Sequence, residues 1–353
     1  MKPNNINSKE LKFSILIPTY NMGDVLSETL RSILAQSYTN FEIIINDNAS
    51  SDNTEEVVKK FQQLDSRIAF SKNSKNLGGP KNMEILRQKA TGDIIYLMAA
   101  DDILGDDALL NTNIAFTLSD DIGAVTRPYI WFDNDTTHMV PVRAKKQLSS
   151  KNDTVVTIND DINNVIRVID TLDQLSGLAY RRIYMDMPFH EEPFATHIYP
   201  FLSIFKKHPV VFLKDYTIAV RIASSVTRKR GLDTYDKSPI LSWKEMIDYV
   251  FSESECEDLK KKIVTRFIAV NYIGLVQIKN YAKYRYLFRE IYYLLKFRPK
   301  NIFSFQFWFF SLGTIIIPPS MLIPMVDWYK NKINSRKLNH IKFNYTLKSE
   351  NNE

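Results

Sequence analysis

Cysteine is nearly absent from this chain of 353 residues, in which Cys256 is the single thiol. One cysteine cannot form an internal disulfide framework or a cluster of thiolate ligands for a metal. Residues 1–12 are polar and lack the apolar core of a secretory signal. Both features predict a protein that stays in a reducing, cytosolic compartment. The sequence also shows no internal repeat and no low-complexity linker.

Charge is distributed unevenly along the chain. The net charge is +6 at pH 7, and 44% hydrophobic with 24% charged residues is the composition of an ordinary globular protein. From Gln277 to the end there are 13 Lys or Arg against 4 Asp or Glu, so the preceding part is slightly acidic. A basic tail of this kind suits an anionic membrane surface or nucleic acid. We expect disorder only at the ends, over residues 1–10 and 342–353.

Short apolar runs alternate with helical patterns over the first third of the chain. This alternation predicts a parallel sheet, because parallel neighbours need crossover helices that cover the sheet on both faces. The expected strands are 13–18, 41–45, 67–71 and 93–98, and the expected helices are 24–36, 54–64, 81–90 and about 105–118. Further strands are expected at 122–126, 178–184 and 210–221, and a helix at 194–207. Beyond Leu241 the pattern is helical throughout.

Polar clusters follow three of these strands. They are Thr19–Asn21, Asn46–Asp52 and the pair Asp101–Asp102. Ligands bind at the carboxyl ends of parallel strands, where loops and helix N-termini supply amide donors. Each cluster also has a simpler interpretation: the first two as turns and helix caps, and Asp102 as the cap of the next helix.

Five segments in this order resemble the family 2 glycosyltransferases, which have the glycosyltransferase-A fold. They read FSILIPTYN at 13–21, SILAQSY at 32–38, FEIIINDN at 41–48, NLGGPKN at 76–82 and GDIIYLMAADD at 92–102. The resemblance is close over residues 13–110 and looser to about 227. It implies an α/β fold with a mostly parallel, Rossmann-like sheet flanked by helices, followed by a helical C-terminal region for membrane association.

The resemblance also implies a set of site residues. The nucleotide-sugar would be bound by Pro18, Thr19, Tyr20, Asn21, Asp47, Gly78, Gly79, Lys81, Ala100, Asp101 and Arg221. Asp101 and Asp102 would hold a divalent metal, Mn²⁺ or Mg²⁺. Lys81 stands where the family usually has an arginine, and Ala99 replaces the first aspartate of its Asp-x-Asp motif. The family's histidine after Arg221 is replaced by Ala223, and Arg228, Lys229 and Arg230 are further candidates for contacting the diphosphate.

The expected domain organisation follows from the same comparison. Residues 1–230 would form the catalytic domain, with a nucleotide-sugar half at 12–130 and an acceptor half at 131–230. Residues 231–353 would form a helical, basic and apolar region.

The catalytic base has three candidates. An inverting transfer needs a carboxylate or imidazole to take the proton from the acceptor hydroxyl. The segment PFHEEPFATHIY at 188–199 offers Glu192, its neighbour Glu191, and His197. The two glutamates precede Pro193, which suits a helix start, where acidic residues can also serve only the helix dipole. Glu192 is our first choice and His197 the second.

Residues 301–326 contain no charged side chain in 26 positions. Pro318, Pro319 and Pro324 interrupt this block, and its flanks are basic on both sides, with Lys330, Lys332, Arg336 and Lys337 after it. We therefore expect a segment that lies in the membrane interface beside a surface-binding helix at 281–300, rather than one that spans the bilayer. The alternative is a helix buried in the core or in a dimer.

Together these features predict an inverting, metal-dependent glycosyltransferase at the cytoplasmic face of the cell membrane. Its donor would be a UDP-sugar, and its acceptor a lipid-linked or envelope polysaccharide, as in capsule or lipopolysaccharide assembly. The alternative is a catalytically silent nucleotide-sugar-binding partner of a glycan-assembly complex. A nucleic-acid binder fits less well, because the aromatic residues of the tail lie in an uncharged block instead of alternating with Lys and Arg.

Overall fold

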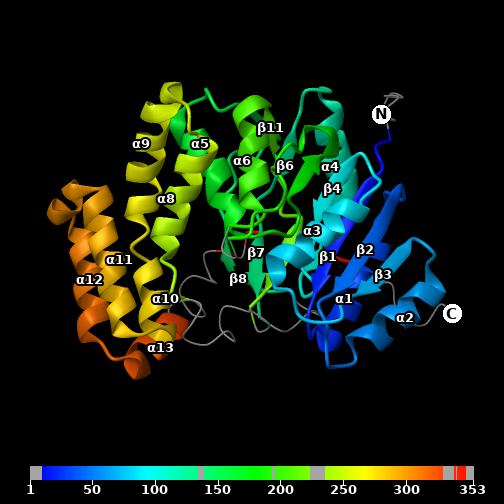
Figure 1. Ribbon diagram of the computed structural model, residues 1–353, viewed down its shortest axis with the longest axis horizontal. Helices are drawn as coiled ribbons and strands as arrows, with labels where there is room; N and C mark the ends of the chain where they lie inside the picture. Colours follow the sequence, from blue (N-terminus) through cyan, green and yellow to red (C-terminus); the bar gives the residue numbers. More distant parts are fainter. Residues whose placement is uncertain are drawn as a thin grey trace.

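A large mixed sheet forms the centre of the molecule (Figure 1). The computed structural model describes residues 10–133, 139–192, 195–222, 235–328, 338 and 340–346. The sheet has the strand order β3-β2-β1-β4-β10-β6-β11-β9. Its strands are β1 (Phe13–Thr19), β2 (Phe41–Asp47), β3 (Ile68–Lys72), β4 (Ile94–Leu97), β6 (Ala124–Thr126), β9 (Thr154–Val156), β10 (Ala179–Arg181) and β11 (Val210–Phe212). The first four are mutually parallel, whereas β10 runs antiparallel to both β4 and β6.

Both faces of the sheet are buried under helices. In β1, Ile15 and Ile17 face one core cluster and Leu16 faces the other, which explains why the strand reads as a continuous apolar run. One face is covered by α1 (Gly23–Leu34), α2 (Thr54–Leu64) and α4 (Ala108–Thr117). The other is covered by α3 (Gly79–Lys89), α5 (Ile162–Asp170) and α6 (Ile198–Lys207). The predicted parallel sheet with covered faces is confirmed.

A smaller sheet packs beside the carboxyl ends of the large one. Its order is β5-β12-β7-β8, and its strands are β5 (Ile103–Leu104), β7 (Ile130–Phe132), β8 (Pro141–Ala144) and β12 (Ile218–Arg221). The predicted strand 210–221 is therefore two strands in two sheets. The chain turns between them at the polar residues Lys214 and Asp215, where the Lys214 N–H donates to Asp153 instead of continuing a strand ladder.

The C-terminal helices lie at one end of the molecule, drawn in yellow and orange in Figure 1. They are α8 (Pro239–Val250), α9 (Glu257–Arg266), α10 (Gly274–Tyr281), α11 (Tyr284–Phe297), α12 (Phe305–Ile316) and α13 (Pro319–Trp328). Short 3-10 turns are η1 (Thr171–Asp173), η2 (Arg182–Tyr184), η4 (Ser254–Cys256), η5 (Ile268–Val270) and η6 (Pro299–Phe303). Apolar residues of α8 to α11 share one core cluster with α3, α5 and α6, so this part of the chain packs continuously onto the sheet.

Two further sequence-based expectations differ from the structure. The helix expected from residue 194 begins only at Ile198, because the Thr196 carbonyl accepts the His190 N–H and its hydroxyl bonds the Glu192 carbonyl, closing a turn. The tail expected to be disordered from residue 342 is ordered at least to Thr346, and it is extended rather than helical. Ile341, Phe343 and Tyr345 pack against the core of the small sheet.

Candidate functional site

The pair Asp101–Asp102 lies just beyond β4, at the carboxyl edge of the large sheet. Asp102 is 1% exposed, and its two carboxylate oxygens accept hydrogen bonds from the Ser176 hydroxyl (2.5 Å) and the Arg221 main-chain N–H (3.0 Å). Burial, followed by the nearby Asp101, raises the pKa of Asp102 to about 7. Asp102 does not cap α4, whose N-cap is Asp107. The Asp102 carboxylate is thus hydrogen-bonded within the protein, whereas Asp101 is partly exposed.

Three contacts fix the main chain of this aspartate turn. The Thr29 hydroxyl of α1 donates to the carbonyls of Ala100 (3.0 Å) and Asp102 (2.9 Å). Arg221, at the end of β12, donates from Nε to the Asp101 carbonyl at 3.0 Å and forms an ion pair with Glu28. Arg221 is 3% exposed. The structure therefore brings Arg221 and Asp101 together, and the buried arginine side chain supports the main chain of the turn from within the protein.

The loop before β10 is a part of the site that the sequence did not reveal. Its Ser176 hydroxyl bonds Asp102 and accepts the Ala99 N–H at 2.9 Å. Arg127 is fully buried and donates to the loop carbonyls of Ser176 (2.6 Å), Gln174 (2.8 Å) and Thr171 (3.2 Å). The signal was present in the sequence, since Arg127 is the one charged residue in the otherwise apolar run 122–132.

Asp47 and Asn21 join the turns that follow β2 and β1. The Asp47 side chain is 0% exposed, accepts the Ser50 N–H (3.0 Å) and hydroxyl, and lies 3.6 Å from the Lys72 ammonium. Asn21 accepts the Ser51 N–H at 2.9 Å. Their neighbours Pro18 and Tyr20 remain partly or well exposed, while the buried Thr19 hydroxyl has no hydrogen-bond partner in the described part of the chain. These residues converge on one edge, as their spacing predicted.

An asparagine network supports the glycine turn before α3. Asn46, Asn73 and Asn82 bond one another through their side chains, and Asn48 accepts the Leu77 N–H at 2.9 Å. This network fixes the turn that leads into Gly78, which caps α3 at a φ of 84° that favours glycine. Gly79 and Lys81 then lie in the first turn of α3, with Lys81 exposed.

Glu192 lies in the turn before α6, with its carboxylate largely shielded from solvent. The ammonium of Lys237, just before α8, forms an ion pair with it, and Lys237 also lies 3.7 Å from Glu245. The Glu192 N–H donates to Nδ1 of His190 at 3.1 Å. Glu191, by contrast, is exposed. Sequence reasoning missed Lys237, because nothing local links it to a residue 45 positions earlier.

His197 is the N-cap residue of α6 and is 8% exposed. Its Nε2 lies 2.8 Å from the Leu172 carbonyl, which can only accept, so Nε2 carries a proton. Burial, together with a smaller effect of the Arg127 charge, lowers the pKa of His197 to about 4 despite this bond. His197 and Glu192 therefore have different environments, since one is a neutral buried ring and the other an ion-paired carboxylate.

The donor set for a divalent metal is small. Within the described ranges no three His, Cys, Asp or Glu side chains converge to form a metal site. Asp102 is already satisfied by Ser176 and Arg221, which leaves Asp101 as the carboxylate of the turn that can reach a ligand. Mg²⁺ commonly binds one or two carboxylates together with substrate phosphates and water. The site thus fits a metal that arrives with a diphosphate. Arg228, Lys229 and Arg230 lie outside the described residues.

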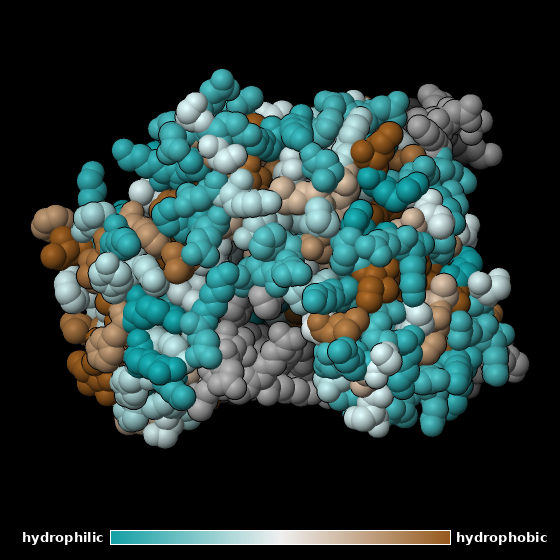
Figure 2. All heavy atoms as spheres, viewed as in Figure 1, coloured by the Kyte–Doolittle hydropathy of each residue, from teal (hydrophilic) through white to brown (hydrophobic). Residues whose placement is uncertain are grey.

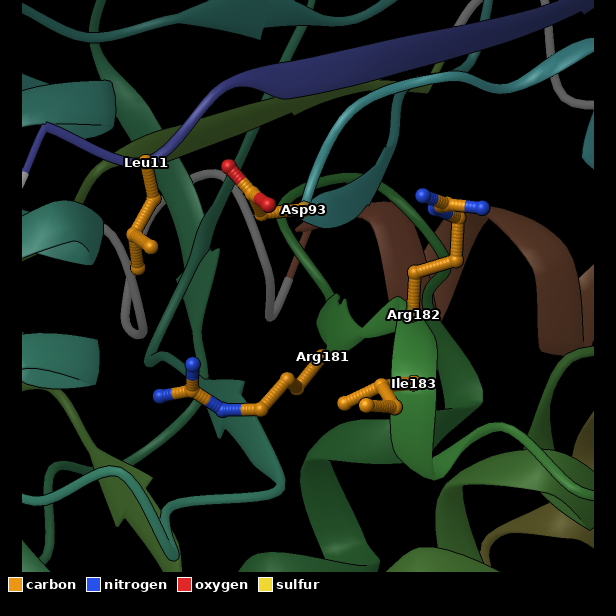
Figure 3. A pocket seen from close by; sticks show the side chains of 5 residues that line it. All are labelled: Leu11, Asp93, Arg181, Arg182 and Ile183. Carbon is orange, nitrogen blue, oxygen red and sulfur yellow. The ribbon is translucent and has the colours of Figure 1, made fainter.

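A hollow of about 360 Å³ opens at the opposite, amino-end edge of the sheet (Figure 3). It is lined by Leu11, Asp93, Arg181, Arg182 and Ile183. Figure 3 shows the two arginine side chains pointing in different directions. Arg181 donates to the carbonyls of Ile122 (2.8 Å) and Phe116 (3.0 Å), and the Asp93 carboxylate accepts the Lys12 N–H at 2.9 Å. These charges hold the strand ends together, and the candidate site remains at the carboxyl edge.

The sheet, its crossover helices and the polar turns at its carboxyl edge define a glycosyltransferase-A fold. Residues 14–168 match the family model described as Glycosyl transferase family 2. The matched segment, residues 14–168, belongs to this family. The resemblance inferred from the sequence is thereby confirmed.

Curated relatives match the N-terminal part of the chain. An uncharacterized glycosyltransferase of Nostoc sp. is 27% identical over 194 residues, which cover 54% of this chain and 56% of the relative. The abequosyltransferase RfbV of Salmonella typhimurium is 39% identical over 99 residues, or 27% of this chain and 30% of the relative. A GalNAc(5)-diNAcBac-PP-undecaprenol beta-1,3-glucosyltransferase of Campylobacter jejuni is 34% identical over 99 residues, or 28% and 32%. The chain thus spans about half or less of the length of these relatives.

Solved structures share the fold over most of the chain. Staphylococcus aureus TarS 1-349 superposes with a TM-score of 0.61 at 17% identity, covering 90% of this chain and 91% of TarS 1-349. Its complex with UDP-GlcNAc gives a TM-score of 0.58 at 16% identity, with the same coverage of 90% and 91%. A Pyrobaculum calidifontis mannosyltransferase in complex with GDP-Man and Mn²⁺ gives 0.53 at 13% identity, covering 94% and 83%. At these identities the likeness is one of fold.

Proposed function

We propose that this protein transfers a sugar from a nucleotide-sugar donor to an acceptor hydroxyl with inversion at the anomeric carbon. The observation that carries the proposal is the aspartate turn after β4. Its partly exposed Asp101 is held by Arg221, and Thr29 holds the carbonyls on either side of it, at the same sheet edge as the turns that contain Asn21 and Asp47. The match of residues 14–168 to the family model supports the proposal as well. The donor we propose is a UDP-sugar, in line with the complex of the fold neighbour TarS with UDP-GlcNAc.

Each group has a specific task in this proposal. Pro18 to Asn21 and Asp47 bind the base and ribose, while the Gly78–Gly79 turn lets the main chain approach the donor, with Lys81 nearby. Asp101 holds the divalent ion, Mn²⁺ or Mg²⁺, which when bound neutralises charge on the departing diphosphate. Asp102 and Arg221 position Asp101, and Ala100 contributes its carbonyl to the same turn.

Glu192 is the proposed base. A base for this reaction must be unprotonated, so that it can accept the proton that the acceptor hydroxyl loses as it attacks. His197 suits this task less well, because its Nε2 proton is engaged by the Leu172 carbonyl and its pKa is lowered to about 4. Lys237 covers Glu192 in the free protein, so the acceptor has to displace this ammonium to reach the carboxylate.

The proposed acceptor is a lipid-linked saccharide or an envelope polysaccharide. The Campylobacter jejuni relative is named for an undecaprenol-linked substrate, which supports a lipid carrier. α12 supports it as well, because the polar Ser311 and Thr314 are buried in this helix while Phe305, Phe309 and Ile316 are 81%, 64% and 73% exposed.

Figure 2 shows apolar side chains gathered over the end of the molecule where α12 and α13 lie in Figure 1. Exposed apolar residues on and beside these helices include Ile302, Phe303, Trp308, Leu312, Met321, Met325 and Trp328. No described helix combines the length and the apolarity that crossing a bilayer requires. We propose that this face lies against an anionic membrane surface, at the inner face of the cell membrane, with Lys296 and Lys300 beside it.

A donor screen tests the function. The purified protein is incubated with UDP-, GDP- and dTDP-sugars and Mn²⁺ or Mg²⁺, and free nucleotide diphosphate is measured with and without an undecaprenyl-linked acceptor. Turnover of one donor that is lost in Asp101→Ala supports the enzyme. Tight binding of a sugar nucleotide without turnover, with or without acceptor, would instead identify a silent binding partner.

A further inference from the structure

The last residues that the structure describes follow the helical region in sequence. They lie against the small sheet and against the loop that comes shortly after the aspartate turn. Residues 341–346 alternate between half-buried Ile341, Phe343 and Tyr345 and exposed Lys342, Asn344 and Thr346. The half-buried set packs on the core of the small sheet, together with Ile103, Ile130, Phe132 and Ala219. A period of two residues is that of an extended segment with one face against a sheet. We refer to residues 341–346 as the strap.

Hydrogen bonds fix the strap to the loop between β5 and α4. The Asp106 N–H donates to the Asn344 carbonyl at 2.9 Å. In return the Asp106 carboxylate accepts the Thr346 N–H and hydroxyl, both at 2.9 Å. The backbones approach closely here, since a Cβ added to Gly105 would lie 3.1 Å from the Phe343 ring and 3.2 Å from the Asn344 carbonyl oxygen. This loop starts only a few residues after Asp101 and Asp102.

The strap reaches the arginine that supports Asp101 through Phe132. Tyr345 packs against the cluster that contains Phe132, and the Arg221 guanidinium lies over the Phe132 ring, 4.9 Å from its centroid. Burial raises the pKa of the Tyr345 phenol to about 12. Its hydroxyl has no hydrogen-bond partner among the residues that the structure describes. The aromatic ring, and not a hydroxyl contact, is therefore what Tyr345 contributes to the free protein.

We propose that the strap is a positioning element of the donor site: it holds the Arg221–Glu28 pair in place, and through it the Asp101 turn. The proposal rests on the function proposed above. The contacts run from the strap to the cluster that contains Phe132, from the Phe132 ring to the Arg221 guanidinium, and from Arg221 Nε to the Asp101 carbonyl. β5 and β12 are adjacent antiparallel strands, so the loop after β5, which the strap binds, is joined by this pairing to the strand that carries Arg221. A loosened strap then displaces Asp101 without removing any group that contacts the donor.

A role confined to stabilising the small sheet is the competing interpretation. It predicts that loss of the strap lowers the melting temperature and leaves the kinetics of the folded fraction unchanged. The positioning role predicts that the donor KM rises in protein that is still folded, because loss of a group that supports a metal ligand typically costs about 10- to 100-fold in metal affinity or activity.

Four variants of the full chain separate the two roles. Phe343→Ala and Tyr345→Ala remove buried rings from the strap, Tyr345→Phe keeps the ring without the unpaired hydroxyl, and Lys342→Ala is the matched control on the exposed face. Donor KM and kcat are measured with the sugar nucleotide and metal that the wild-type protein uses. Hydrogen exchange at the Asp106 amide, which donates to Asn344, reports whether the strap is docked.

We expect Phe343→Ala and Tyr345→Ala to expose the Asp106 amide and to raise the donor KM by about ten-fold, with a smaller change in kcat. Tyr345→Phe and Lys342→Ala should behave as the wild type does. An exposed Asp106 amide with an unchanged donor KM overturns the strap proposal and leaves the function standing. A wild-type chain that turns over no sugar nucleotide contradicts the function, and the strap proposal falls with it.

Discussion

The main-chain N–H of Arg221 donates a hydrogen bond of 3.0 Å to Oδ1 of Asp102, across 119 positions of sequence. The Arg221 side chain meanwhile bonds the carbonyl of the neighbouring Asp101. The two adjacent aspartates thus have different tasks. Asp102 is a buried anchor, whose hydrogen bonds join the large sheet to the small one. Asp101 is the partly exposed carboxylate of the same turn.

This division of tasks predicts that substitutions of Asp102 and Asp101 affect stability and turnover differently. Asp102→Ala leaves the Ser176 hydroxyl and the Arg221 N–H without their acceptor, which should lower the free energy of unfolding by about 2–4 kcal/mol. Asp101→Ala should lower it by less than about 1 kcal/mol and abolish donor turnover. Urea unfolding and the donor assay on both variants measure this. Equal destabilisation by the two changes would contradict the anchor role of Asp102.

Glu192→Gln tests the base. The change removes proton affinity and keeps the size of the side chain, so kcat should fall by about 10²- to 10⁴-fold with little change in donor KM. Glu191→Gln is the matched control, since this neighbouring carboxylate is exposed. If Glu192→Gln retains near-normal turnover while His197→Gln is inactive, His197 is the base.

The sequence revealed the parts of the fold that depend on local pattern. Helix 54–64 was predicted with the bounds that α2 has, because an amphipathic run ends in polar residues on both sides. The convergence of Asn21, Asp47 and Asp101 was also predictable, since parallel strands share one carboxyl edge.

What escaped prediction depends on contacts between distant segments. Ser176 reaches Asp102 from 74 positions away, and Lys237 reaches Glu192 from 45. No periodicity in a single sequence encodes such pairs. The strap was not predictable for a related reason: its alternating pattern covers only residues 341–346, and its partner is the core of the small sheet, whose residues lie far away in sequence.

His197 should make the stability of the protein depend on pH. Burial holds its pKa near 4 in the folded chain, against an ordinary value of about 6.5 in the unfolded chain. Above pH 6.5 neither state binds the proton. Between pH 6.5 and 4 the unfolded state binds a proton that the folded state does not, so the free energy of unfolding falls by up to about 3 kcal/mol as the pH is lowered, and the effect levels off below pH 4.

His197→Gln isolates this contribution, because a glutamine amide can still donate to the Leu172 carbonyl but does not titrate. The difference in unfolding free energy between wild type and His197→Gln should be constant above pH 7 and shift in favour of the variant towards pH 4. Urea unfolding at several pH values measures it. A difference that stays flat over this range would show that His197 is not a buried neutral ring.

Gly177→Ala should disturb the site through the loop that carries Ser176. Gly177 has φ 83°, and an added Cβ would lie 2.6 Å from Ile218 and 2.8 Å from Nε of Arg127. We expect the substitution to lower the free energy of unfolding by about 1–3 kcal/mol and to raise the donor KM. Gly313→Ala is the control, since nothing lies within 4 Å of its added Cβ in the helix interior, and it should stabilise the protein by up to about 1 kcal/mol. Unchanged stability in Gly177→Ala would mean that the loop readily moves.

The outward-facing aromatic residues of α12 give the last prediction. Phe305→Ser with Phe309→Ser removes two exposed rings from the proposed membrane face and leaves the buried Phe307 in place. Co-sedimentation with vesicles that contain anionic phospholipid should fall at least ten-fold, because each ring contributes about 1.5–3 kcal/mol when it leaves water. Leu64→Ser is the matched control, since Leu64 is 62% exposed on α2 at the other end of the molecule (Figure 1). Equal retention of the two variants on vesicles would contradict the membrane role of this face. A wild-type chain that stays in the supernatant and forms dimers that the double substitution dissociates would assign the face to a second copy of the chain.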